Sequence, residues 1–306
     1  MKSKGLLLAI IATFLWGTHS VLGRYLAGSL PVELISVSRL LIGALSLLCL
    51  LLFRVFTGSE TIEVLKLRRN DVQPLVVSSV CVGINLFLFH WGLKFTTANN
   101  AMVLESTAPI FVALLAPLFL LERISKRDIS LSLVAFFGIL LVVYSNNAGT
   151  FSIFGDSIEL LAGLTWALFI LLSKKLNSDS TSLTQRLKNL MYVLFGAGLL
   201  LLAFTVLNTE LTVKRNWLLP LLYLGVFPTA IAYSCWYEAG TLLKPTLLAI
   251  LFNLSVVFTT LNAYLFLGEK LSLLSCLGIS IILGAITWMA LKNDNGTDPA
   301  LATEGH

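Results

Sequence analysis

The sequence of 306 residues contains little charge, since Asp, Glu, Lys and Arg together make up only 12% of it. Apolar residues make up 57%, and the mean hydropathy is +0.89. Soluble domains carry roughly 25% charged residues, so the surplus of apolar residues must face lipid rather than water. The low charge excludes an ordinary water-soluble domain and predicts an integral membrane protein.

Cysteine and histidine are also scarce. The four cysteines stand singly within apolar runs, and the sequence has no Cys-x-x-Cys, His-x-x-x-His or Glu-x-x-His spacing. We therefore expect neither a metal site nor redox chemistry, and no cofactor. A Walker motif is also lacking, so any energy for transport would come from solute or ion gradients. The net charge of +5 does not indicate nucleic acid, because basic residues in membrane proteins sort by side.

What the sequence has instead is a series of long apolar runs. A membrane-spanning helix needs about 20 residues, and isolated strands cannot satisfy their backbone groups in lipid. Lys2 and Lys4 precede the first run, which extends to about Leu26 and is expected to be an uncleaved helix rather than a signal peptide. The ten predicted spans are 5–26, 32–53, 73–93, 97–121, 129–145, 157–173, 187–207, 217–239, 246–267 and 272–291.

The two halves of the sequence resemble each other. At an offset of 150 residues Trp16 aligns with Trp166, and at an offset of 147 Glu122 aligns with Glu269. Five spans in each copy is an odd number, so the second copy must enter the membrane from the opposite side. We predict an all-α membrane protein of ten transmembrane helices in two inverted five-helix repeats. The predicted units are residues 1–147, residues 148–292 and a polar cytoplasmic tail at 293–306.

The basic residues favour one orientation. With the N-terminus placed inside, fifteen of the 21 Lys and Arg residues fall on the inner side and six on the outer side. Because cytoplasmic loops are enriched in Lys and Arg, we expect both termini in the cytoplasm. The expected location is a bacterial inner membrane.

Several motifs resemble those of EamA-type members of the drug/metabolite transporter superfamily. Trp16-Gly17-Thr18-His19 is similar to the early Trp-Gly motif of that family, and Pro31 and Arg39 resemble its second helix. The segments that resemble its fourth-helix signature are Ala98-Asn99-Asn100-Ala101, Ala108-Pro109-Ile110-Phe111 and Leu121-Glu122-Arg123-Ile124-Ser125, with a repeat at Phe266–Ser272. The resemblance covers about residues 5–291. The chain departs from it at Ser255-Val256, where Glu-Pro is frequent, and at Glu105, where a neutral residue is usual.

The resemblance implies a carrier of small solutes, often an exporter of amino acids or other metabolites. It implies a central cavity lined mainly by helices 1, 3, 4, 6, 8 and 9, with helices 5 and 10 at the periphery. The expected partners are a small-molecule substrate and the lipid bilayer, and the chain is expected to be a monomer or a weak homodimer through the peripheral helices.

Ionisable residues inside a membrane are costly, so each is a functional hypothesis. At 1.5 Å per residue, His19, Arg39 and Glu105 lie at a shared depth of roughly 10–12 Å below the outer boundary. We expect Glu105 to pair with Arg39, and His19 to join them. Glu105 would bind a substrate ammonium or carry a proton; the alternative is a purely structural ion pair. For Arg39 a structural role is favoured, with a substrate carboxylate anchor left open. His19 is either a proton-binding residue or a packed, hydrogen-bonded histidine.

The second copy replaces these ionisable residues with aromatic and amide ones, so we expect a polar wall from the first copy and an aromatic wall from the second. The mid-helix indoles of Trp16 and Trp166 would stack on a substrate or face a cation, with helix packing as the alternative. His90, beside Trp91, is expected at the interface, and Glu238 as a solvated cap or gate. The predicted substrate-binding residues are Trp16, His19, Asn85, Glu105, Trp166, Phe169, Tyr233, Tyr237 and Asn253.

Together these features predict a secondary transporter that works by alternating access on small metabolites, with an amino acid or a related metabolite as the expected substrate. Nucleobases, nucleosides and cationic drug-like compounds are alternative substrates. A membrane enzyme is a remote alternative, because it would require His19, His90 and Glu105 to converge from three helices.

Overall fold

The structure is a computed structural model that describes residues 2–27, 29–92, 94–95, 101, 104–120, 126–146, 152–177, 182–208, 217–267 and 271–292. Within these ranges every regular element is a helix and there is no strand. Several predicted segments lie outside the described residues, namely the motif residues 98–100, 121–125 and 268–270 and the tail at 293–306.

The helices follow the predicted spans closely. They are α1 (Lys2–Ala27), α2 (Val32–Phe56), η1 (Ile62–Leu65), α3 (Arg69–Gly92), α5 (Ala108–Leu120), α6 (Lys126–Asn146), α7 (Ile153–Asn177), α8 (Leu183–Asn208), α9 (Leu218–Gly225), η3 (Val226–Ile231), α10 (Ala232–Leu242), α11 (Pro245–Phe252), α12 (Leu254–Leu267) and α13 (Leu273–Lys292). The elements α9, η3 and α10 form one continuous rod over 218–242, and α11 and α12 follow each other across Asn253.

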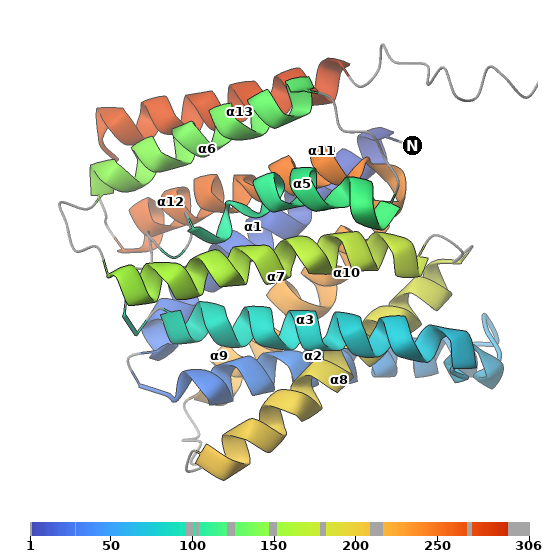
Figure 1. The fold of residues 1–306 in the computed structure, drawn as a ribbon. Helices are drawn as coiled ribbons and strands as arrows, with labels where there is room; N and C mark the ends of the chain where they lie inside the picture. The colour runs from blue at the N-terminus through green and yellow to red at the C-terminus, as the bar shows by residue number, and fades with distance from the viewer. Residues whose placement is uncertain are drawn as a thin grey trace, which may run out of the picture.

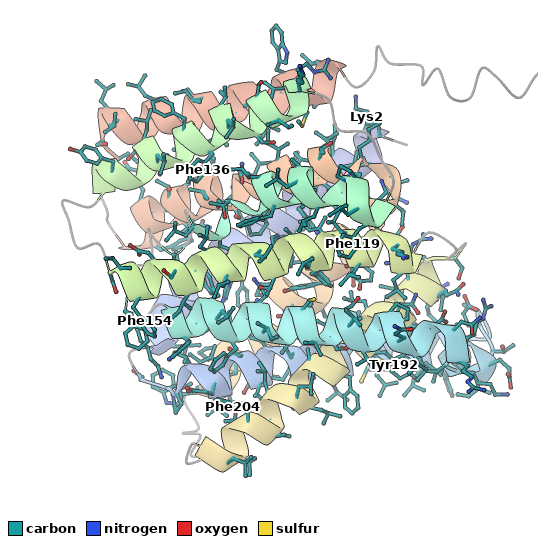
Figure 2. The ribbon with its side chains drawn as sticks, in the orientation of Figure 1. Lys2, Phe119, Phe136, Phe154, Tyr192 and Phe204 are labelled. Atoms are coloured by element: carbon teal, nitrogen blue, oxygen red, sulfur yellow. The ribbon has the colours of Figure 1, made fainter. Side chains whose placement is uncertain are left out.

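When α9, η3 and α10 are counted as one helical segment and α11 and α12 as another, eight helical segments are long and apolar enough to cross a membrane. Each has at least 18 residues and high hydropathy. Two further apolar helices, Ala108–Phe119 and Ile129–Val142, are shorter within the described residues. Large apolar side chains are exposed along the sides of the bundle, among them Phe53, Leu118, Tyr144 and Leu207. Figure 2 shows carbon-rich side chains projecting outward from the helices, the surface expected of a protein in lipid.

The helices pack in layers, with α6 and α13 side by side at one edge (Figure 1). Below this pair, α7 packs on α3 and α5, and α8 packs on α2 and α3, while α1 lies against α10 and α12. Glycine allows the closest approaches, because a Cβ atom at Gly138 would lie 2.8 Å from the Gly278 carbonyl oxygen. Small residues at such crossings are typical of membrane helix packing.

Two helical segments are interrupted near the centre of the bundle. Ser106 and Thr107 form a turn before α5, and Asn253 forms a turn between α11 and α12. These turns are related by the 147-residue offset of the sequence repeat, since position 106 corresponds to 253. Interrupted helices leave backbone groups and side chains available around a cavity, as in many transporter sites.

A third irregularity lies in the rod over 218–242. Pro228 has no N–H to donate, and the helix widens to π geometry over Val226–Ile231. The freed groups find other partners: the Thr229 hydroxyl donates to the Leu224 carbonyl at 2.7 Å, and the Trp16 indole Nε1 donates to the Pro228 carbonyl at 2.9 Å. The widened turn therefore fixes Trp16 of α1 against this rod.

Candidate functional site

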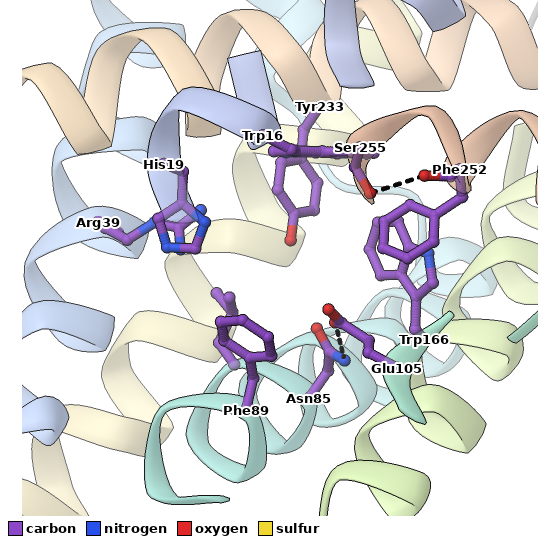
Figure 3. Close-up of a pocket in the computed structure, with 11 residues that line it drawn as sticks. Trp16, His19, Arg39, Asn85, Phe89, Glu105, Trp166, Tyr233, Phe252 and Ser255 are labelled. Carbon is purple, nitrogen blue, oxygen red and sulfur yellow. Dashed lines mark hydrogen bonds between the residues drawn. The ribbon is translucent and has the colours of Figure 1, made fainter. Parts of the chain in front are cut away.

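The three irregular segments surround a pocket at the centre of the bundle. The cavity volume is about 40 Å³, which is well below the roughly 300–1,000 Å³ of sites that hold a drug-sized molecule. Binding of a solute would therefore require the walls to move apart. Residues from α1, α2, α3, α7, α10, α11 and α12 and from the segment before α5 meet there (Figure 3). The lining residues are Trp16, His19, Arg39, Asn85, Leu86, Phe89, Glu105, Trp166, Tyr233, Phe252 and Ser255.

Glu105 supplies the acidic wall of the pocket. Its carboxylate accepts a hydrogen bond from Asn85 Nδ2 at 3.2 Å, and the same amide donates to the Ala162 carbonyl at 3.0 Å. Close packing of α7 holds this segment in place, because a Cβ atom at Gly163 would lie 2.8 Å from the Leu104 carbonyl oxygen. Asn85 thus links α3, α7 and the Glu105 segment, and it orients the carboxylate toward the pocket.

Arg39 and His19 supply the basic wall. Arg39 Nη1 lies 2.5 Å from His19 Nε2, and Arg39 Nε donates to the Thr229 hydroxyl at 3.3 Å. Both side chains are buried, and Thr229 belongs to the π-helical segment. The guanidinium is therefore held between α1 and the irregular rod, so its direction is fixed before any solute arrives.

The predicted Glu105–Arg39 pair is not made directly. Arg39 is bonded to His19 and Thr229, whereas Glu105 is bonded to Asn85. Figure 3 shows the two groups on opposite walls with Tyr233 between them. Arg39 and Glu105 do not form the predicted ion pair because each is hydrogen-bonded to neutral side chains on its own wall of the pocket. The two groups line the same small pocket from different walls.

His90 lies in the core and not at the interface, which corrects the sequence-based expectation. It is 1% exposed, its Nδ1 lies 2.7 Å from the Ser36 hydroxyl, and its ring centroid is 5.7 Å from that of His19. Trp91, the next residue, packs on Phe87 and Phe95 instead. Because adjacent helical residues point about 100° apart, His90 faces the core while Trp91 faces the outer side of the helix.

The aromatic residues of the pocket form one cluster. Trp16 and Trp166, which are aligned in the two copies of the sequence, are in contact with ring centroids 5.2 Å apart at 85°. Trp16 also meets Tyr233 at 5.5 Å and Phe252 at 5.7 Å. Three of these rings come from the second half of the chain, and they lie beside Glu105. Ring faces next to a carboxylate suit a cationic group.

Three predicted binding residues do not line this pocket. Phe169 is buried behind it, between Trp166 and Tyr237, and Tyr237 lines a second, smaller cavity of about 10 Å³ together with Ser173 and Asn177. Asn253 is fully buried, and neither polar atom of its side chain has a hydrogen-bond partner among the described residues. Its neighbours Phe252 and Ser255 line the pocket instead.

Sequence reasoning missed Leu86, Phe89 and Ser255 as lining residues. Leu86 directly follows Asn85 in α3, and Phe89 lies four residues, about one turn, beyond Asn85, so for Phe89 the helical period of that span was a usable signal. Ser255 marks the departure from the family pattern at Ser255-Val256. Its hydroxyl donates to the Phe252 carbonyl at 2.7 Å, one of the carbonyls that the helix break leaves available.

Glu238 also differs from its prediction as a solvated residue. It makes a two-point ion pair with Arg186, in which Nε faces Oε1 and Nη2 lies 3.0 Å from Oε2. Both side chains are 13% exposed. The pair joins the start of α8 to the last turns of α10.

Among the described residues, no group of three or more His, Cys, Asp or Glu side chains is arranged to hold a metal ion. The pocket instead offers separated acidic and basic groups, an amide and aromatic faces. These groups can bind and orient a small polar solute without covalent chemistry.

The fold defines a multi-pass membrane protein with a small polar and aromatic pocket at its centre. The sequence profile of the EamA-like transporter family matches the chain twice, over residues 3–144 and 153–291. The chain therefore belongs to the EamA-like transporter family, and it is a membrane transporter.

Similar proteins include an uncharacterized transporter of Clostridium kluyveri, 26% identical over 92% of this chain and 92% of that protein. Another is the uncharacterized transporter YetK of Bacillus subtilis, 26% identical over 90% of this chain and 83% of that protein. The uncharacterized inner membrane transporter YicL of Salmonella typhimurium is 24% identical over 95% of this chain and 96% of that protein. A solved crystal structure at 18% identity matches 95% of this chain and 99% of its own with a TM-score of 0.79, which supports the same fold.

Proposed function

We propose that the protein is a secondary carrier that binds a small zwitterionic metabolite of the amino-acid class and moves it by alternating access. The observation that carries this proposal is the separation of Glu105 from Arg39 across the central pocket. A substrate ammonium would lie between Glu105 and the faces of Trp166 and Phe252. A substrate carboxylate would lie at Arg39, whose planar donors match it.

The proposed architecture is ten transmembrane helices in two inverted repeats, residues 1–147 and 148–292, with both termini in the cytoplasm. Its support is the odd number of spans in each copy, the contact of Trp16 with Trp166 and the matching turns at 106 and 253. The excess of basic residues on one side supports the orientation. We further propose a bacterial cytoplasmic membrane as the location, with any dimer formed weakly through α6 and α13, which lie at one edge.

A cationic compound without a carboxylate is the second candidate substrate. The observation that favours it is the aromatic cluster beside Glu105, which would bind a cation whether or not an anionic group is attached. The two candidates differ at Arg39, which a zwitterion would engage and a simple cation would not.

A thermal-shift comparison on the purified full chain tests the proposal. Each amino acid is compared with its decarboxylated amine and with its deaminated acid, and nucleosides serve as an unrelated set. The proposal expects stabilisation by an amino acid that exceeds that of both truncated relatives. Equal stabilisation by the amine favours the cation, and stabilisation by nucleosides alone refutes both.

Substitution of Glu105 with Gln extends the test to transport. The variant keeps the size of the side chain and the Asn85 contact but removes the negative charge, so exchange of the stabilising amino acid across a vesicle membrane is expected to be abolished. The matched control is Glu63→Gln, which removes an exposed carboxylate in η1 that pairs with Lys66 at the surface. Exchange by Glu105→Gln at the control rate contradicts the assignment of Glu105.

A further inference from the structure

A second carboxylate, Glu159, lies buried one layer away from the pocket. It stands two turns into α7, is fully buried, and neither carboxyl oxygen has a hydrogen-bond partner in the part of the chain that the structure describes. A charged carboxylate in such a place would lack both water and protein donors, which is strongly unfavourable. Such surroundings favour the neutral, protonated acid over the carboxylate.

The space for this side chain is built into α3. The carboxyl group of Glu159 rests against Gly92, where a Cβ atom would lie 2.7 Å from the Glu159 Cδ and closer still to Oε1. Any residue other than glycine at position 92 would displace it. The backbone of α3 therefore provides a cradle for the acid without offering a donor that would hold it in the ionised form.

Glu159 lies between two other carboxylates. Asp156, one turn earlier in α7, is half-buried near the end of the bundle where α7 begins. Glu105 lies on the other side, on the segment packed against Gly163, which is one turn further along the same face of α7. Both interact electrostatically with Glu159. Gly92, the residue of α3 that faces it, carries no side chain, so within the described part of the chain these two acids are its titratable neighbours.

We propose that Glu159 is a proton-binding site of the carrier, and that Asp156, Glu159 and Glu105 form a relay for protons from the start of α7 to the central pocket. The inference rests on the proposed carrier function. Glu159 first gives its proton to water in the pocket or to Glu105, which breaks its O–H bond and leaves it as a carboxylate. A proton that water has placed on Asp156 then passes to Glu159, so that the Asp156 O–H bond breaks and an O–H bond forms again on Glu159. Acidic chains of this kind mark proton pathways in membranes.

The relay also explains how solute and proton would be coupled. Two carboxylates in one weakly polar region repel each other, so a proton on Glu159 favours the ionised form of Glu105. Only the ionised Glu105 would bind a substrate ammonium. Protonation of Glu159 would therefore promote substrate binding, and loss of that proton would promote release.

The first test requires no substrate. Infrared spectra of the purified full chain in heavy water at neutral pH reveal protonated carboxyl groups by their C=O stretching band. Glu159→Gln is expected to remove one such band, whereas the control Glu63→Gln leaves it in place. An unchanged band in Glu159→Gln overturns the proposal, even if no amino acid is ever found to be transported.

The second test separates coupling from transport. Vesicles containing the full chain receive an imposed pH difference, and the accumulation of the stabilising amino acid is compared with its exchange at equal pH. Glu159→Gln is expected to retain exchange and to lose at least tenfold in gradient-driven accumulation, and Glu159→Asp, which restores an acid, to recover part of it. Accumulation by Glu159→Gln equal to that of the wild type overturns the relay while the carrier function stands. Folding of each variant is verified by thermal unfolding.

Discussion

Replacement of Gly92 with Ala probes the contact between α3 and α7 most directly. The added methyl group would lie 2.7 Å from the Glu159 Cδ, roughly 1 Å inside the usual separation of about 3.5–4.0 Å. Either the carboxyl group rotates away or the two helices separate. Overpacking of this kind costs about 1–3 kcal/mol. Each kcal/mol lowers the apparent Tm of a chain of this size by roughly 2–4 °C.

Thermal unfolding of the purified full chain in detergent measures this effect, and a double-variant cycle assigns it. In the background Glu159→Ala the carboxyl group is gone, so Gly92→Ala is expected to cost little. The control is Gly284→Ala in α13, where a Cβ atom would meet nothing within 4 Å, so Tm should be unchanged or slightly raised. If Gly92→Ala lowers Tm equally with and without the Glu159 carboxyl group, the reasoning about the cradle is refuted.

Two further substitutions test the site and the scaffold. Arg39→Lys removes the planar donor set that meets both His19 and Thr229. The ratio of the affinity for an amino acid to that for its decarboxylated amine should therefore fall by about tenfold, equivalent to about 1.4 kcal/mol. Competition binding measures this ratio, and an unchanged ratio would remove Arg39 from the substrate site. Gly278→Ala places a methyl group 2.9 Å from the Val142 backbone nitrogen, so it should destabilise the α6–α13 pair by about 1–3 kcal/mol, and a Tm equal to that of Gly284→Ala would contradict the close packing.

The spans were predictable because lipid imposes a simple rule on sequence. An apolar run of about 20 residues has few alternatives to a helix, and the predicted span 32–53 corresponds to α2 at Val32–Phe56. The interruptions were not predictable in the same way. Asn253 and Ser106 are compatible with a continuous helix, and their turns follow from packing around the pocket, which hydropathy does not describe.

The pocket was partly predictable for a similar reason. Depth along a span can be counted, so His19, Arg39 and Glu105 were expected in one layer, and they line one pocket. Rotation about the helix axis is set by neighbouring helices instead. His90 was therefore misjudged: by count it lies near the end of its span, yet its side chain is buried. In a membrane protein the hydrophobic pattern of a helix does not indicate which face is buried, because the face toward lipid is also apolar.

The comparison of the two halves relates these observations to transport. Trp16 and Trp166 are equivalent in sequence and touch each other, so they lie where the two halves meet. Glu105 and Phe252 are also equivalent and both line the pocket, but only one is charged. A pocket with equivalent walls would hold a solute in two opposite orientations, whereas under the proposed function this one would distinguish the two ends of a zwitterion. Because Arg39 contacts Thr229 of the π-helical segment, the proposed protonation of Glu159 would act on the ammonium end of the solute, and movement of that segment on the carboxylate end.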